Sequence, residues 1–188
     1  MNLAHASKAL LDPADAIALT THGENAAVLV PLRLHADDTV HCVFTKRRDD
    51  LSKHAGEISF PGGRPEDHDK DLVATALREA HEEIGLLPGD VNLLGALPPI
   101  STYVTNFAIY PFVGVVAAEL IWTPQQREVE SVLEFELGLL ASVYERREIV
   151  RLGFGFETDA YEIDGHLIWG ATARILTTTL DRLQSLIV

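Results

Sequence analysis

The segment from Gly62 to Gly85 constrains the fold most, because it encodes a tight loop, a helix and a helix stop in direct succession. Its apolar residues recur at helical spacing and fall within about 140° of a helical wheel; they are Leu72, Val73, Ala76, Leu77, Ala80 and Ile84. Asp69 or Asp71 can cap the N-terminus, and Gly85 stands where a left-handed residue commonly ends a helix. The pattern predicts an amphipathic helix over 72–84 with one face in a hydrophobic core.

The other apolar runs predict strands and helices around that helix. Asp164-Gly165 favours a type I′ turn and predicts a hairpin over 161–169. Pro111 indicates a bulge or an edge strand within its own apolar run. Strands are expected at 26–34, 39–46, 57–60, 91–97, 107–117 and 128–136, and further helices at 1–12, 137–146 and 171–188. A chain of 188 residues with this order of elements predicts one α/β domain with a mixed sheet.

Charge and cysteine content narrow the kinds of partner. Fifteen Lys and Arg against 28 Asp and Glu give a net charge of −13, which repels the phosphate backbone of nucleic acids and anionic membrane surfaces. Cys42 is the single cysteine, which excludes an internal disulfide and a cysteine-based zinc site. There is no apolar run of membrane-spanning length, and the first residues lack the pattern of a secretory signal. A cytoplasmic location is therefore expected.

Three carboxylates share one stripe of the predicted helix. Glu79, Glu82 and Glu83 fall in a sector about 100° wide, separate from the apolar face. Arg78 stands four residues before Glu82 and can pair with it, which leaves one cation for three acids. Oxygen ligands at this density suit Mg²⁺ or Mn²⁺. The alternative interpretation is an acidic helix face that is merely solvated.

The segment Arg78-Glu79-Ala80-His81-Glu82-Glu83-Ile84-Gly85-Leu86 resembles the signature of the Nudix hydrolases. It matches every fixed position of the second half of that signature. In the first half, Gly63 lies one residue further from Arg78 than the general pattern has it, and the family's first glutamate would fall at Lys70, between Asp69 and Asp71. The resemblance implies a Nudix-type α/β/α sandwich with a mixed β-sheet and a Nudix box at about 63–86.

A second resemblance, upstream of the box, is to the coenzyme A pyrophosphatase subgroup. Thr45, Arg47, Gly56 and the run Phe60-Pro61-Gly62-Gly63 fall at matching places, whereas Arg48 and Ser52 depart from the subgroup's pattern. The resemblance extends over about 25–176. It implies a Nudix domain over that range, an N-terminal helix and lead-in over 1–24, and a helix end over 177–188 that belongs to the same domain.

The resemblance also implies roles for particular residues. Glu79, Glu82 and Glu83 would hold one to three Mg²⁺ or Mn²⁺ ions, with Glu82 as the first choice of general base. Glu128, from another element, is the second choice, and Arg78 is placed with the catalytic residues. Gly62 and Gly63 would shape the loop at the metals. Phosphate contacts are expected from the cations just upstream, although these residues could instead merely offset Asp49 and Asp50; they are Arg47, Arg48, Lys53 and His54.

The implied reaction is metal-dependent hydrolysis of the pyrophosphate of coenzyme A, or of a derivative, to 3′,5′-ADP and 4′-phosphopantetheine. Two alternatives remain open. One is a Nudix hydrolase for another nucleoside diphosphate compound, such as ADP-ribose or a dinucleotide. The other is a non-catalytic regulator that binds a nucleotide, which the intact acidic triplet disfavours. The expected partner is a small molecule rather than nucleic acid or membrane, and the protein is expected to be a monomer or a homodimer.

Overall fold

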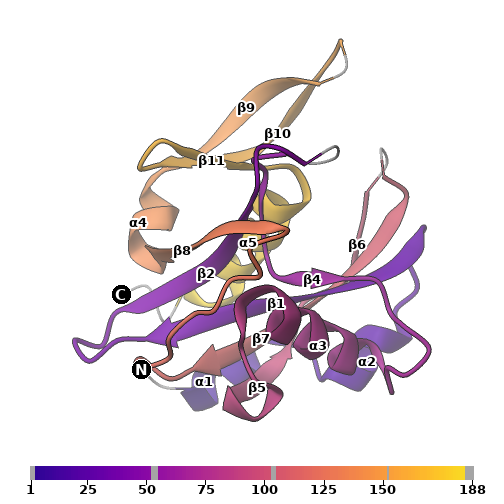
Figure 1. Ribbon diagram of the computed structural model, residues 1–188, viewed down its shortest axis with the longest axis vertical. Helices are drawn as coiled ribbons and strands as arrows, with labels where there is room; N and C mark the ends of the chain where they lie inside the picture. The colour runs from indigo at the N-terminus through magenta and orange to yellow at the C-terminus, as the bar shows by residue number, and fades with distance from the viewer. Residues whose placement is uncertain (1–2, 52–54, 103–104, 152, 185–188) are drawn as a thin grey trace.

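The computed structural model describes residues 3–51, 55–102, 105–151 and 153–184 (Figure 1). Its helices are α1 (Leu3–Lys8), α2 (Pro13–Ala18), α3 (Leu72–Ile84), the short 3₁₀ helix η1 (Pro88–Asp90), α4 (Leu137–Ser142) and α5 (Gly170–Arg182). Its strands are β1 (Glu24–Leu34), β2 (Val40–Arg47), β3 (Ile58–Ser59), β4 (Gly62–Gly63), β5 (Val91–Ala96), β6 (Ile100–Ser101), β7 (Phe107–Val116), β8 (Val129–Glu136), β9 (Tyr144–Arg151), β10 (Phe154–Ile163) and β11 (His166–Trp169).

An eight-stranded mixed sheet forms the centre of the molecule. Its order runs β3-β2-β1-β7-β5, with β4 paired to β1, β6 to β7 and β8 to β2. The β1–β7 pair is parallel, from Glu24 opposite Phe107 to Arg33 opposite Val116, and the other pairs of this sheet are antiparallel. A separate antiparallel sheet of order β11-β10-β9 carries a hairpin that projects at the top of Figure 1.

The two faces of the central sheet bury different layers. On one face, Ala27 and Leu29 of β1 share a core with Ala76, Ala80 and Ile84 of α3. On the other face, Val30 and Leu32 of β1 join a second core, to which α5 and the β9–β11 sheet contribute, among others, Leu176, Ile163 and Ile168. The alternation along β1 sends successive side chains to opposite faces. The architecture confirms the predicted α/β/α sandwich with a mixed sheet.

Most predicted elements are confirmed, and the differences have local causes. The predicted N-terminal helix over 1–12 is α1, which ends at Lys8. A second helix, α2, is not predicted; Asp12 caps it by accepting from the Ala14 N–H at 2.8 Å, and Pro13 opens it. The predicted helix over 137–146 ends at Ser142, and the chain continues as β9. The Asp164-Gly165 turn has positive φ at both residues, as a type I′ hairpin requires.

The expectation that Pro111 marks an edge or a bulge is wrong. Pro111 lies in β7, between β1 and the β5/β6 side of the sheet. On that side the β5 pairing ends at Ala96 opposite Phe112, and the β6 pairing begins at Ile100 opposite Ile109. The missing N–H of Pro111 therefore falls where the neighbouring strand changes, and costs no ladder bond.

Within the described ranges, no helix has the length and apolar character needed to cross a membrane.

Candidate active site around the α3 carboxylates

Helix α3 begins and ends through the residues that the sequence indicates. Asp71 caps it by accepting a hydrogen bond from the Ala74 N–H at 2.8 Å. Gly85 ends it with φ of 74°, and its N–H bonds back to the carbonyls of Ala80 and His81. With the apolar face of α3 fixed on the sheet, the acidic stripe faces the loop that follows β4. His81 is exposed, as predicted for a surface residue.

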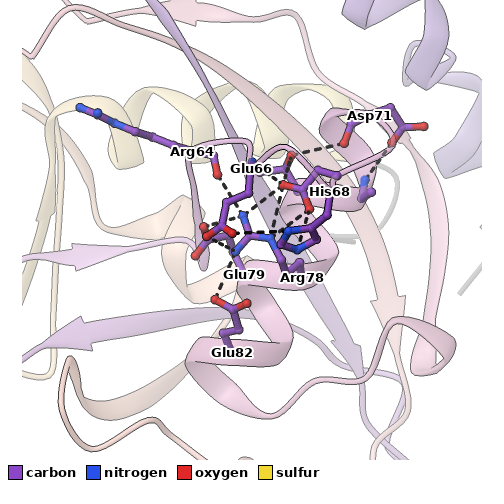
Figure 2. Close-up of polar contacts among 10 residues, drawn as sticks. Arg64, Glu66, His68, Asp71, Arg78, Glu79 and Glu82 are labelled. Atoms are coloured by element: carbon purple, nitrogen blue, oxygen red, sulfur yellow. Dashed lines mark hydrogen bonds and ion pairs between the residues drawn. The ribbon is translucent and has the colours of Figure 1, made fainter.

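Arg78 is the centre of a hydrogen-bond network that joins this loop to α3 (Figure 2). Its guanidinium donates to the Arg64 carbonyl at 2.9 Å, to Glu79 Oε1 at 3.0 Å and to Glu82 Oε2 at 3.2 Å. Its Nη1 also lies 3.8 Å from Glu66 Oε1. The predicted Arg78–Glu82 pair is confirmed as one contact of a larger set. Five N–H donors in a rigid plane allow one side chain to hold this many acceptors in fixed positions.

The strongest partner of Arg78 is Asp69, for which the sequence predicts only possible helix capping. Its carboxylate accepts from Arg78, from Thr75 Oγ1 at 3.0 Å and from the Glu66 N–H at 2.9 Å. The side chain is only 4% exposed. The Arg78 hydrogen bond lowers the pKa of Asp69 from 3.8 to about 2, so the carboxylate is charged. The family resemblance places the first glutamate of the signature at Lys70, whereas the acid that binds Arg78 in the structure is Asp69, one residue earlier.

Glu79 is held against the glycine loop. A methyl group at Gly63 would overlap the Glu79 carboxylate, so this glycine provides the space that the carboxylate occupies. Gly62 approaches β1 closely, because a methyl group there would overlap the Ala27 carbonyl and Val28. Burial raises the pKa of Glu79, while Arg78 opposes that shift. Gly62 and Gly63 thus shape the loop at the acids, as expected.

Glu83 is the most deeply buried acid of the stripe. Its Oε2 is inaccessible and has no hydrogen-bond partner in the described part of the chain. Burial, followed by the charge of Glu79, raises the pKa of Glu83 to about 8, whereas Arg47 and a Gly62 backbone hydrogen bond act in the opposite direction. A buried carboxylate with an oxygen that nothing satisfies is costly unless a cation completes it.

Arg47 and Glu128 reach the same acids from other elements. Arg47 ends β2, and its Nη2 lies 3.7 Å from Glu128 Oε2, just before β8. Both residues act electrostatically on Glu83, Arg47 lowering and Glu128 raising its pKa. The β2–β8 pairing shifts register at Lys46 and Arg47, which redirects the strand end here. Two residues predicted from separate parts of the sequence therefore stand together at the acidic stripe.

The remaining predicted site residues do not converge on Glu79 and Glu83 in the described structure. Glu82 is 56% exposed and turned toward Arg78, and among the described residues the three α3 carboxylates do not bring their ligand oxygens within 4.8 Å of one another. Arg48 binds both oxygens of Asp50, at 2.7 and 2.6 Å, and the Gln126 carbonyl at 2.9 Å. This contact favours the alternative in which Arg48 offsets a neighbouring acid. Lys53 and His54 lie outside the described residues.

Two open grooves flank the end of β2. One, of about 500 Å³, lies between the segment that leads into β3 and the second sheet, and its lining includes Lys46, Gly56, His166 and Trp169. The other, of about 550 Å³, is lined by the residues around Arg48 and the start of β8. Arg47 stands in sequence between Lys46 and Arg48.

The residues at α3 fit a hard divalent cation. Their donors are carboxylate oxygens, which Mg²⁺ and Mn²⁺ prefer, and one of these oxygens is buried without a protein partner. Arg78 already has partners in Asp69, Glu66 and Glu82, so its charge is not available to Glu83. Glu79 and Glu83 would hold such a cation, and Glu82 would join them after a side-chain rotation.

Comparisons with known proteins agree with this arrangement. The family model described as NUDIX domain matches residues 23–151. Nudix hydrolase NudL of Pectobacterium atrosepticum is 37% identical over 153 residues, which cover 80% of this chain and 78% of the relative. A Nudix hydrolase from M. smegmatis, RenU, superposes with a TM-score of 0.53 at 18% identity, over 63% of this chain and 74% of that one. A MutT/nudix family protein from Enterococcus faecalis gives 0.57 at 12% identity, over 89% and 64%. The two structures show a shared fold, and the family model and the NudL relative show that this chain belongs to the Nudix family.

Proposed function

We propose that this Nudix protein hydrolyses the pyrophosphate bond of coenzyme A, or of a derivative, to 3′,5′-ADP and 4′-phosphopantetheine. The observation that carries the proposal is the buried, unsatisfied Oε2 of Glu83 beside Glu79, with Arg47 of the upstream motif at the same acids. Three acids alone are compatible with many pyrophosphate compounds. The choice of coenzyme A rests on the upstream motif, whose arginine stands where a phosphate would be bound.

In the proposed reaction, water adds to one phosphorus, the bridging P–O bond breaks and the bridging oxygen leaves with the other phosphate. A divalent cation supplies charge neutralisation for the phosphoryl oxygens and a more acidic water. Glu79 and Glu83 would hold Mg²⁺ or Mn²⁺, and Arg78 keeps Glu79 oriented through its 3.0 Å hydrogen bond. In this proposal Arg78 positions Glu79, and the cation is bound by Glu79 and Glu83.

Glu82 is proposed as the group that accepts the proton of the attacking water. Its carboxylate is the most exposed of the three, and only Oε2 bonds to Arg78 in the network described above. Glu128 is the second candidate, because it is also exposed and lies beside Arg47. Arg47 would bind a substrate phosphate by exchanging its 3.7 Å contact with Glu128 for a closer one. Arg48 would contribute only after releasing Asp50.

The functional unit is proposed to extend over 25–176, beyond the range of the family model. Helix α5 and strands β10 and β11 share a core with β1 and β2, so the domain needs them to cover the second face of the sheet. The groove lined by Lys46 and Trp169 is also built partly from this region. We propose this groove as the place for part of the organic portion of the substrate.

The test is a substrate panel with and without cation. Coenzyme A, ADP-ribose and a dinucleoside polyphosphate are incubated with Mg²⁺, Mn²⁺ or EDTA, and products are identified by mass spectrometry. The expected result is cation-dependent release of 3′,5′-ADP and 4′-phosphopantetheine from coenzyme A, faster than turnover of the others. Turnover of ADP-ribose without turnover of coenzyme A would overturn the substrate assignment alone. No turnover of any compound would overturn the catalytic proposal.

A further inference from the structure

A second cluster of ligand side chains lies at the opposite end of β2 from Arg47. Among the described residues, one group of three His, Cys, Asp or Glu side chains has ligand atoms all within 4.8 Å of one another: His35, His41 and Glu134. His41 and Arg47 are six residues apart on one strand, which corresponds to about 20 Å. The cluster is therefore separate from the α3 acids.

From this geometry we propose that His35, His41 and Glu134 form a site for Zn²⁺ or a similar divalent transition metal. Two imidazole nitrogens and one carboxylate oxygen are a known zinc ligand set that leaves a fourth position for water. Imidazole suits zinc, cobalt and nickel, whereas Mg²⁺ prefers oxygen ligands. The chain would thus hold two kinds of cation at two ends of one strand. This inference does not depend on the proposed hydrolysis.

The backbone brings the three side chains together from distant parts of the chain. His41 opens the β2–β8 ladder opposite Glu136, and Glu134 lies opposite Val43, so Glu134 and Glu136 share the sheet face of His41. His35 follows β1, and its N–H donates to the Thr39 carbonyl at 2.9 Å, which closes the β1–β2 turn. The rings of His35 and His41 are tilted against each other with centroids 4.2 Å apart.

Hydrogen bonds from Arg33 and Trp122 fix the orientation of the Glu134 carboxylate. Its Oε1 accepts from Arg33 Nη1 at 2.6 Å and from Trp122 Nε1 at 2.5 Å. Arg33 is itself fixed, because it donates to the carbonyls of Ala118 and Leu120 and lies over the Trp122 ring. With Oε1 occupied, Oε2 is left to face His35. Such supporting hydrogen bonds are typical of the second layer of metal sites.

The imidazole of His35 has an unsatisfied nitrogen aimed at this point. His35 Nε2 is buried and has no hydrogen-bond partner within the described residues, and Glu134 Oε2 lies 3.7 Å away, too far for a hydrogen bond. A metal between these atoms would satisfy both. Glu134, Glu136 and Asp37 all act electrostatically on His41, and Arg33 is already paired with Glu134.

Zinc binding can be measured separately from the Nudix site. Tag-free protein is saturated with Mg²⁺, titrated with Zn²⁺ by calorimetry, and its metal content is determined after dialysis. The expected result is one Zn²⁺ per chain in addition to Mg²⁺, and a rise in thermal stability on zinc addition. Co²⁺ in place of Zn²⁺ is expected to give a visible ligand-field band typical of nitrogen ligands.

His35→Gln and His41→Gln are expected to weaken zinc binding at least tenfold and to abolish the cobalt band. Glu134→Gln keeps an oxygen for Arg33 and Trp122 but removes the charge, and should give the same loss of zinc binding. Because it also weakens the mostly buried Arg33 pair, a lower melting temperature is expected for this variant, and the histidine variants carry the test. The control is His22→Ala, at an exposed histidine outside the cluster, which should bind zinc as the parent does. The proposal would be overturned if the parent protein did not bind zinc. It would also be overturned if a variant carrying both His35→Gln and His41→Gln bound zinc as the parent does. Zinc lost through Glu83→Gln instead would also overturn it.

Discussion

Asp69 and Arg78, nine residues apart in the chain, meet through hydrogen bonds from Arg78 Nε to Asp69 Oδ1 at 3.0 Å and from Nη2 to Oδ2 at 3.1 Å. The pair connects the loop after β4 to the second turn of α3, and the same guanidinium holds Glu79 and Glu82. A change at Asp69 should therefore affect Glu79 and Glu82 through Arg78, which contacts all three acids.

Asp69→Asn is expected to lower the free energy of unfolding by about 2 kcal/mol, because a charged hydrogen-bond acceptor is lost from a mostly buried pair. Turnover should fall as well, since Arg78 no longer keeps Glu79 in place. Urea unfolding and initial-rate assays measure the two effects. Asp67→Asn, at an exposed neighbouring acid, is the control. Equal stability of the two variants would contradict the role given to Asp69.

The same residue predicts how stability depends on pH. The pKa of Asp69 falls from 3.8 to about 2 on folding, chiefly through the Arg78 hydrogen bond. For a carboxylate with a lowered pKa, the stabilisation is present above the unfolded-state pKa and is lost as pH falls toward the folded-state pKa. Between pH 5 and pH 2, about the span of this titration, the parent should therefore lose more stability than Asp69→Asn. Parallel slopes for both proteins in urea titrations would count against this linkage.

Gly63→Ala should impair activity with little effect on the fold. The added methyl group overlaps the Glu79 carboxylate, so Glu79 must move away from its position beside the loop. We expect turnover to fall at least roughly tenfold, as for a displaced supporting group at a metal site. Gly89→Ala is the matched control, because its methyl group would meet no atom within 4 Å. Similar activity of the two variants would show that the Gly63 space is not required.

Glu83→Gln is expected to change stability and activity in opposite directions. Burial raises the pKa of Glu83 to about 8, so folding at neutral pH carries the cost of protonating or desolvating this carboxyl. Glutamine removes that cost, and the metal-free protein should melt at a higher temperature. Turnover should fall by roughly 100-fold or more, in line with loss of a group that stabilises the transition state. Glu82→Gln should also lose activity, without the gain in stability, because Glu82 is exposed. Near-normal rates in both variants would refute the assignment of these acids.

Arg47→Ala tests which phosphate of the substrate Arg47 binds. If Arg47 binds the phosphates that distinguish coenzyme A, its loss should raise KM for coenzyme A more than for dephospho-coenzyme A, with kcat less affected. Its contact with Glu128 is long and partly exposed, so folding should tolerate the change. Arg127→Ala offers a control at a nearby exposed arginine. An equal rise in KM for both substrates would place Arg47 at the pyrophosphate alone.

Local patterns predicted the parts of this structure that local forces determine. Helix α3 was predicted with its observed ends, because apolar spacing, the Asp71 cap and Gly85 all act within one segment. The Asp164-Gly165 hairpin followed from turn chemistry in the same way. Strand β9 is not predicted, and its residues 144–146 fall within the predicted helix over 137–146. Its charged residues give no strand periodicity, and only pairing with β10 makes it a strand.

Contacts between residues far apart in the sequence could not be predicted from residue spacing. Asp69 reaches Arg78 because the loop after Gly63 turns back on α3, a path that no periodicity encodes. His35, His41 and Glu134 converge only through the β2–β8 register, which joins segments almost a hundred residues apart. The i,i+4 spacing predicts the Arg78–Glu82 pair, whereas the contacts of Arg78 with Asp69 and with the Arg64 carbonyl cross the loop and are not encoded by that spacing.

The parallel ladder between β1 and β7 has a consequence for how the protein is made. Its partners, such as Glu24 and Phe107, are about eighty residues apart, and α3 lies in the segment between them. The sheet on which α3 packs is therefore incomplete until β7 has been synthesised and has left the ribosome. During translation, a chain that stops short of Val116 therefore exposes the unpaired edge of β1 beside α3.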